Sequence, residues 1–165
     1  MNDKKIIILM IASTIILLFG GIFFLTKTTS TPEIKTSQNA KAYVADPTSF
    51  DWGTIPMSKG NAVKSFTIKN TGTDILKLYN VKTSCHCTKA YVTIDGTDSP
   101  SFGMEGLSSW TGEVLKGAEA KLTAVFDPAY HGPQGTGPIN RFVSVETNDP
   151  ANTKLTFTLT GNVVK

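Results

Sequence analysis

Leu155-Thr156-Phe157-Thr158-Leu159-Thr160 is the stretch that decides the fold class. Its large apolar residues alternate with threonines, and strict alternation is typical of a β-strand with one buried and one solvated face. Other runs in the second part of the chain show the same period of two. The residues that we expect to line the core share this one-faced pattern: Phe66, Ile68, Leu76, Leu78, Leu122, Phe126, Leu155, Phe157 and Leu159.

Short β-type runs fill the chain from Ala42 onward, with turn residues such as Asn70-Thr71-Gly72 between them. No helical period appears after residue 25, and about seven such runs favour an all-β, antiparallel β-sandwich. Gly96–Gly112 is rich in glycine and serine and is expected to be a long loop. The expected strands are Tyr43–Val44, Phe50–Ile55, Lys64–Lys69, Ile75–Thr83, Lys121–Phe126, Arg141–Thr147 and Leu155–Thr160.

The first 41 residues have a different composition. Residues 6–25 contain no charge, and 20 residues of helix span about 30 Å, the thickness of the hydrocarbon core of a bilayer. We therefore expect a flank at 1–5, a transmembrane anchor at 6–25, a flexible polar linker at 26–41 and an immunoglobulin-like domain at 42–165.

Lys4 and Lys5 predict that the N-terminus is cytoplasmic and that the β domain is extracytoplasmic, as in a single-pass protein of the cell membrane. The alternative is a cleaved secretory signal. An uncleaved anchor is favoured because the apolar run is longer than a signal core and because no Ala-x-Ala site follows it.

Charge and motifs exclude several classes of function. From Thr28 onward the chain has 13 Lys and Arg against 12 Asp and Glu, so it lacks the basic patch that nucleic acids require. Metalloprotease, phosphate-loop and nucleophile-elbow motifs are all absent. The sequence therefore predicts that the protein is not an enzyme and binds no nucleic acid.

Cys85-His86-Cys87 holds both cysteines of the chain and one of its two histidines. Loops of a sandwich gather at its ends, and we expect Met104 and His131 at the same end as the cysteines. Thiols, a thioether and an imidazole suit Cu(I) or, through Cys and His alone, zinc. The candidate metal ligands are Cys85, Cys87, His131 and Met104, whereas His86 is the weaker imidazole because its side chain would point to the other face.

Two other states of the cysteines stay open. They could be small buried hydrophobic residues, or they could form a disulfide in an oxidising compartment. In an extended segment their Cα atoms would lie about 6.5 Å apart, near the outer limit for a bridge, so such a bond would be strained and easily reduced. A redox role follows from that last alternative.

An ordered set of motifs resembles the bacterial domain-of-unknown-function family numbered 1573, related to immunoglobulin-like domains of the major-sperm-protein type. The motifs are Phe50-Asp51-x-Gly53-x-Ile55, Phe66-x-x-x-Asn70-x-Gly72, Cys85-x-Cys87-Thr88, Phe126-Asp127-Pro128, Thr147-Asn148-Asp149 and Leu159-x-Gly161. The likeness covers about residues 42–164. It implies an immunoglobulin-like fold in an exported or anchored protein, without an established activity.

The sequence departs from the family beside the cysteines, where His86 replaces the usual glycine and the Gly96–Gly112 connection is longer. We expect a membrane-anchored module that binds or assembles with a cell-envelope protein, since most such sandwiches are scaffolds. The alternative is a soft-metal or thiol-redox module that works through the Cys-His-Cys stretch.

Overall fold

The computed structural model describes residues 10–17, 34–105 and 108–165. Residues 10–17 are helical, and the Thr14 hydroxyl donates to the Met10 carbonyl at 2.6 Å. Much of the expected anchor at 6–25 lies outside the described residues, so the anchor stays a prediction. Within the described parts of the chain, no helix combines the length and the apolar character that crossing a membrane requires.

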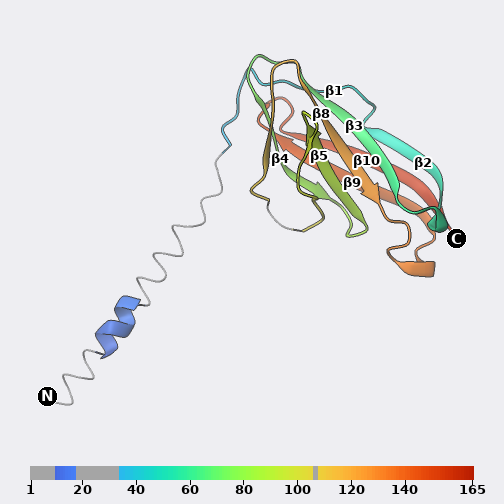
Figure 1. Cartoon of the computed structure of the whole chain (residues 1–165), viewed down its shortest axis with the longest axis horizontal. Helices are drawn as coiled ribbons and strands as arrows, with labels where there is room; N and C mark the ends of the chain where they lie inside the picture. The colour runs from blue at the N-terminus through green and yellow to red at the C-terminus, as the bar shows by residue number, and fades with distance from the viewer. Residues whose placement is uncertain (1–9, 18–33, 106–107) are drawn as a thin grey trace. The chain divides into compact units, whose positions relative to one another are not determined.

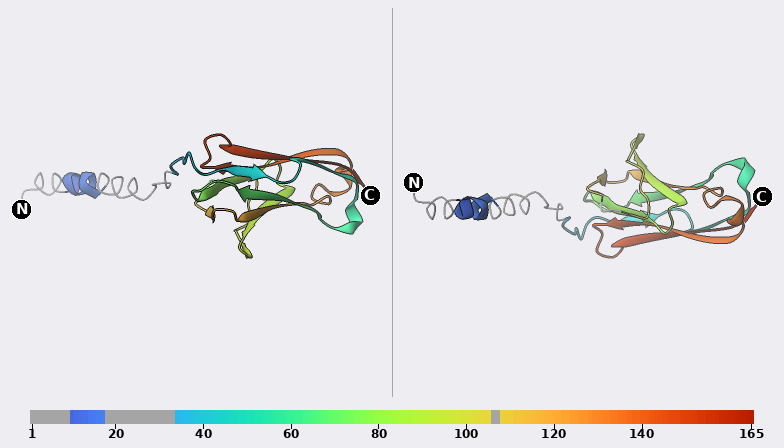
Figure 2. Two further views of the ribbon diagram at one scale, coloured as in Figure 1. Left: turned by 90° about the horizontal axis from the view of Figure 1, so that it is seen from above. Right: turned by 90° about the horizontal axis from the view of Figure 1, so that it is seen from below.

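Residues 42–164 form a β-sandwich of two five-stranded sheets, which Figures 1 and 2 show as two layers. The first sheet has the order β1 (Ala42–Val44), β3 (Ala62–Asn70), β8 (Glu119–Phe126), β5 (Thr88–Ile94) and β6 (Thr97–Asp98). The second has the order β2 (Ser49–Pro56), β10 (Lys154–Val164), β9 (Gly137–Thr147), β4 (Leu76–Thr83) and β7 (Thr111–Val114). Two short 3-10 helices, η1 (Met57–Lys59) and η2 (Gly132–Gln134), lie in connections.

The sandwich predicted from the sequence is confirmed, but its details need two corrections. The described residues hold ten strands rather than about seven, because β5, β6 and β7 were missed and two of them lie within or next to the expected loop Gly96–Gly112. The second sheet is also mixed rather than purely antiparallel, since β2 pairs with β10 in parallel, whereas the pairings of the first sheet are all antiparallel. Alternation shows which face of a strand is buried, but not which strand lies beside it or in which direction.

The nine residues expected in the core are all buried, which confirms that part of the prediction. Phe66 of β3 and Phe157 of β10 meet between the sheets with ring centroids 4.5 Å apart. Each lies on the inward face of an alternating strand, so the period of two was a sufficient guide to the centre of the sandwich.

One end of the sandwich is held by buried polar side chains. Asn70 donates from Nδ2 to the carbonyls of Asp74 at 2.8 Å and Val114 at 2.9 Å, and its Oδ1 accepts the Gly72 N–H at 3.0 Å. A Cβ atom at Gly72 would lie 2.0 Å from the Asn39 carbonyl oxygen, so no other residue fits there. The Asn70-x-Gly72 motif is therefore structural.

Thr147-Asn148-Asp149 completes this polar end. Asn148 Oδ1 accepts the Lys77 N–H at 2.8 Å, and Asp149 Oδ2 accepts the Ala42 N–H at 2.9 Å. Burial alone would raise the pKa of Asp149, but hydrogen bonds from the Asn152 side chain and from backbone N–H groups lower the pKa overall. The motif joins β1 and β4 to the end of β9.

The last part of the expected linker packs against the same end. The Ser37 N–H donates to the Asn148 carbonyl at 2.9 Å, and Ala40 is fully buried in the main core. Residues 34–165 accordingly form one compact unit.

Candidate metal site

The cysteines lie in a tight turn between β4 and β5, at the opposite end of β4 from Asn70 and Asn148. The Thr88 N–H donates to the Cys85 carbonyl at 3.1 Å, and the Thr83 hydroxyl donates to the Thr88 carbonyl at 2.9 Å. Ser84 exchanges two hydrogen bonds with Phe142 of β9, at 3.0 and 2.9 Å. The turn is thus fixed to both sheets.

Cys85 and Cys87 form a disulfide, and their Cα atoms are 5.2 Å apart. The expectation of an extended segment with a separation of about 6.5 Å was wrong, because the chain turns here. The observed separation lies inside the ordinary range for disulfides, so the argument for strain that rested on an extended strand does not apply.

The two sulfurs have different surroundings. Cys87 is only 2% exposed and belongs to a small hydrophobic cluster with Ile55, Phe126 and Val163, whereas Cys85 is half-buried. The Cys85 sulfur accepts the N–H of Cys87 at 3.2 Å. A stacked pair of rings, Trp52 and Phe126 with centroids 5.9 Å apart, supports the cluster.

Arg141 of β9 donates from Nε to the Cys87 sulfur at 3.2 Å. Its guanidinium lies 5.6 Å from the centroid of the Phe126 ring, and its Nη1 donates to the Asn140 carbonyl at 2.9 Å. Burial lowers the pKa of Arg141. In the sequence this residue stands out only as the start of an expected strand. The one signal that could have drawn attention to it is that it is the single arginine of the chain.

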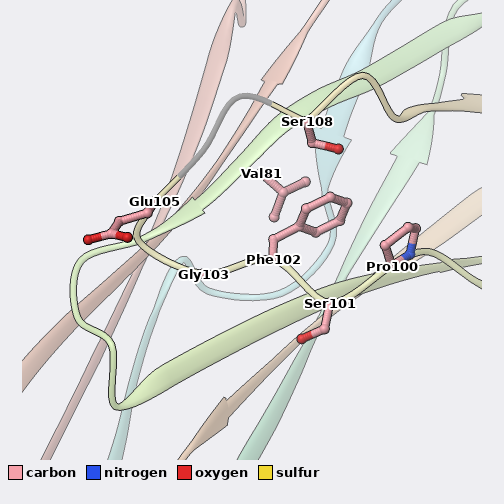
Figure 3. A pocket seen from close by; sticks show the side chains of 7 residues that line it. All are labelled: Val81, Pro100, Ser101, Phe102, Gly103, Glu105 and Ser108. Carbon is pink, nitrogen blue, oxygen red and sulfur yellow. The ribbon is translucent and has the colours of Figure 1, made fainter.

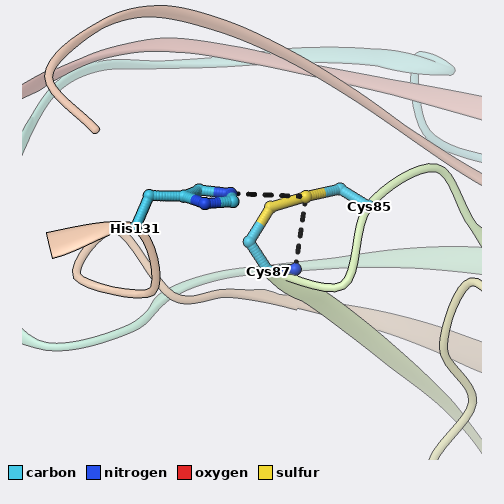
Figure 4. Close-up of side chains that lie close together, drawn as sticks. All are labelled: Cys85, Cys87 and His131. Carbon is cyan, nitrogen blue, oxygen red and sulfur yellow. Dashed lines mark hydrogen bonds between the residues drawn. A yellow bond between two sulfur atoms is a disulfide. The ribbon is translucent and has the colours of Figure 1, made fainter. Parts of the chain in front are cut away.

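His131 comes from the connection between β8 and β9 and reaches the same sulfurs (Figure 4). The connection is tied to the cysteine turn by the Asp127 N–H, which donates to the Cys87 carbonyl at 2.9 Å. His131 Nε2 lies 4.0 Å from the Cys85 sulfur. The ligating atoms of Cys85, Cys87 and His131 all lie within 4.8 Å of one another, so three of the four predicted ligands come together.

His86 and Met104 are placed differently. His86 turns toward the connection after β6, where its Nε2 lies 3.4 Å from the carboxylate of Glu105, and both side chains are exposed. The cluster of three candidate ligands does not include His86. Met104 is 40% exposed in the same connection, and its role as a fourth ligand stays a prediction.

A pocket borders the connection that carries Met104, and Figure 3 shows the side chains around it. Phe102 and Val81 form its apolar floor, and the lining residues are Val81, Pro100, Ser101, Phe102, Gly103, Glu105 and Ser108. None of the three clustered ligands lines this pocket, so it is separate from the sulfur site.

A family model and several solved structures are similar to this chain. The model of the family "Protein of unknown function (DUF1573)" matches residues 44–98, which include both cysteines and confirm the resemblance found in the sequence. No curated protein matches the chain.

Among solved structures, the chain is similar to a protein of unknown function from Porphyromonas gingivalis W83, with 19% identity and a TM-score of 0.56. That match covers 79% of this chain, which spans 50% of the other. The chain is less similar to a PapD-like domain of human CEP192, with 18% identity and a TM-score of 0.47; that match covers 81% of this chain and 92% of the other. WR4, a C. elegans MSP family member, gives 14% identity, TM-score 0.40 and coverage of 78% and 100%.

Proposed function

We propose that this chain, whose residues 44–98 match the model of a family of unknown function, is a membrane-tethered soft-metal-binding protein. Cys85, Cys87 and His131 would hold one copper or zinc ion once the disulfide is reduced. The observation that carries the proposal is the convergence of two sulfurs and one imidazole nitrogen within 4.8 Å, from two separate connections.

One of the distances between the candidate ligands already suits an ion. Bonds of about 2.0 Å to nitrogen and about 2.3 Å to sulfur allow two ligands to lie up to about 4.3 Å apart on one ion. The observed distance between His131 Nε2 and the Cys85 sulfur, 4.0 Å, is already within that limit. The two sulfurs must separate on reduction, and the turn that carries them is partly open to solvent at Cys85.

The chemistry of the donors favours a soft ion. Two thiolates and an imidazole suit Cu(I) and zinc, whereas Mg²⁺ and Ca²⁺ prefer oxygen ligands. Both cysteines must lose their protons to bind, so metal affinity should rise with pH. Met104 would add a thioether that only Cu(I) favours.

The tether is the second part of the proposal. Residues 6–25 carry no charge, and Lys4 and Lys5 precede them, which supports an N-terminus inside the cell and a sandwich outside it. Protease added to intact spheroplasts should then remove the sandwich. Protection of the sandwich would contradict this orientation, and release of the protein without detergent would contradict the anchor.

A second candidate function is a binding or assembly module for another protein of the cell envelope. Strand β2 supports it, since this eight-residue strand is at the edge of its sheet and pairs with β10. Edge strands can accept a strand from a partner. Capture of the same partner by wild type and by Cys85→Ser/Cys87→Ser would favour this function over metal binding.

The test of metal binding is an anaerobic Cu(I) titration of the reduced full-length chain in detergent against a competing chelator, with a parallel zinc titration. We expect one ion per chain, no binding by Cys85→Ser/Cys87→Ser, and affinity at least about tenfold lower for His131→Ala. Met104→Leu shows whether the thioether is a ligand. A stoichiometry near zero for the wild type, or affinity that survives loss of both thiols, would overturn the proposal.

A further inference from the structure

We propose that the Cys85–Cys87 disulfide undergoes exchange with external thiols in a fixed direction, in which Cys85 is attacked and Cys87 leaves. Arg141 holds the leaving sulfur. This activity goes beyond metal binding and does not depend on it, because it starts from the oxidised protein and requires no ion.

The two cysteines differ in their exposure to solvent. Thiol exchange requires the incoming thiolate to approach one sulfur along the line of the disulfide bond. Cys85 is half-buried and faces the exposed side chain of His131, whereas Cys87 is 2% exposed and packs with Ile55, Phe126 and Val163. An external thiol therefore reaches Cys85 and not Cys87.

The two sulfurs also differ in their hydrogen bonds, because only the Cys87 sulfur accepts one from Arg141. Arg141 Nε donates to the Cys87 sulfur at 3.2 Å, and the contacts of the guanidinium with Phe126 and with the Asn140 carbonyl hold it there. A hydrogen bond from a cation to an anionic acceptor is stronger than one to a neutral acceptor. The bond therefore strengthens as negative charge develops on Cys87, and a sulfur stabilised in this way leaves faster.

The hydrogen bonds at Cys85 are of another kind. Its sulfur accepts a backbone N–H, that of Cys87, and its other neighbour is His131 Nε2 at 4.0 Å. No cationic guanidinium lies against it, since the single arginine of the chain is bonded to Cys87. Accessibility and leaving-group stabilisation thus point to the same direction.

The step balances with a thiol as the reductant. A thiolate RS⁻ attacks the Cys85 sulfur, an R–S–S–Cys85 bond forms, the Cys85–Cys87 bond breaks, and its electron pair stays on Cys87. A second RS⁻ attacks the external sulfur of the mixed disulfide, which releases RSSR and the Cys85 thiolate. Two thiols are oxidised to one disulfide, and the protein gains two electrons and takes up protons from solvent.

The direction can be read from the mixed disulfide. The oxidised full-length chain in detergent, with a metal chelator present, is mixed briefly with glutathione, quenched in acid and alkylated. The tryptic peptide Thr83–Lys89 contains both cysteines, and His86 between them allows fragment ions to assign each modification. We expect glutathione on Cys85 and the alkyl group on Cys87. Glutathione on Cys87, or equally on both, would overturn the proposal.

Variants that remove or keep the positive charge of Arg141 test its role. Arg141→Gln should slow reduction by glutathione about tenfold and make the midpoint potential more negative by about 30 mV for each tenfold loss in the equilibrium constant. Arg141→Lys keeps the charge and should restore most of the rate. Lys82→Gln, which removes a positive charge from the neighbouring strand β4, is the matched control and should change neither quantity.

The variants also separate a structural role from the proposed one. If Arg141→Gln does not show the cooperative unfolding of the wild type, the reduction rate of Arg141→Lys replaces it as the test of the proposal. A rate for Arg141→Lys within about threefold of wild type supports the proposal, and a rate about tenfold slower in a folded Arg141→Lys would overturn it. A rate and potential unchanged in a folded Arg141→Gln, or equally changed in Lys82→Gln, would overturn it. All these outcomes are independent of whether the reduced protein binds Cu(I).

Discussion

The two ends of the sandwich both carry motifs that stand out in the sequence, but they are built differently. At the polar end, defined by Asn70, Gly72, Asn148 and Asp149, buried side chains bond to backbone groups. At the cysteine end, the sulfurs of Cys85 and Cys87 meet two side chains that can carry charge, His131 and Arg141, and one sulfur is half-exposed.

This difference distinguishes a motif with a structural role from a motif with a chemical role. An amide or a carboxylate bonded to buried backbone groups has no free capacity for a ligand, so the polar end holds strands together. Sulfurs beside an imidazole and a guanidinium can change oxidation state and accept an ion. The motif at one end is therefore explained by the fold, and the motif at the other end is explained by the reactions we propose.

The largest expected effect is at the polar end. Asn70→Ala would leave the part-buried carbonyl of Asp74, the buried carbonyl of Val114 and the Gly72 N–H without their partner, and each lost bond costs about 1–3 kcal/mol. We expect urea denaturation to show a loss of about 3 kcal/mol or more. The exposed Asn162 on β10 is the control, and Asn162→Ala should change the free energy of unfolding by less than about 0.5 kcal/mol. Equal losses would remove the contrast between the ends.

Reduction of the disulfide should have a smaller effect. The bond closes a loop of only three residues, and the loop-entropy model gives about 1–2 kcal/mol for so short a loop. Urea denaturation of the wild type with and without reductant, in the presence of a metal chelator, measures it. A loss as large as that of Asn70→Ala would mean that the disulfide is mainly structural.

The smallest effect is the contribution of Asp149 to acid stability. Its pKa is lowered in the folded state, so the unfolded chain takes up this proton first as the pH falls. The stabilisation is complete above the ordinary pKa of an aspartate, about 4, and is lost as the pH falls through the lower folded value. Asp149→Asn should flatten the dependence of unfolding free energy on pH between about 5 and 2. An unchanged slope would show that other carboxylates dominate.

Much of the sandwich could be predicted because burial of one strand face leaves a direct record in the sequence. Phe66, Leu122 and Phe157 each lie in an alternating run, and all three are buried. The alternating pattern is weaker in strand β5, which was therefore missed. The parallel pairing of β2 with β10 has no pattern in the sequence, since pairing depends on contacts between distant segments.

The candidate site was predicted in part for a similar reason. Cys85, Cys87 and His131 could be grouped because connections of a sandwich gather at its ends, and the structure brings their ligating atoms together. Arg141 could not be found in this way. It lies within β9, and its approach to Cys87 depends on the register of that strand against β4 and on the ring of Phe126.

X-ray absorption at the copper edge of the reduced, Cu(I)-loaded full-length chain tests the proposed metal site most directly. The account predicts two sulfur ligands and one imidazole nitrogen in the wild type, with the nitrogen lost in His131→Ala and retained in His86→Ala. A first shell without sulfur, or one that His131→Ala leaves unchanged, would contradict it.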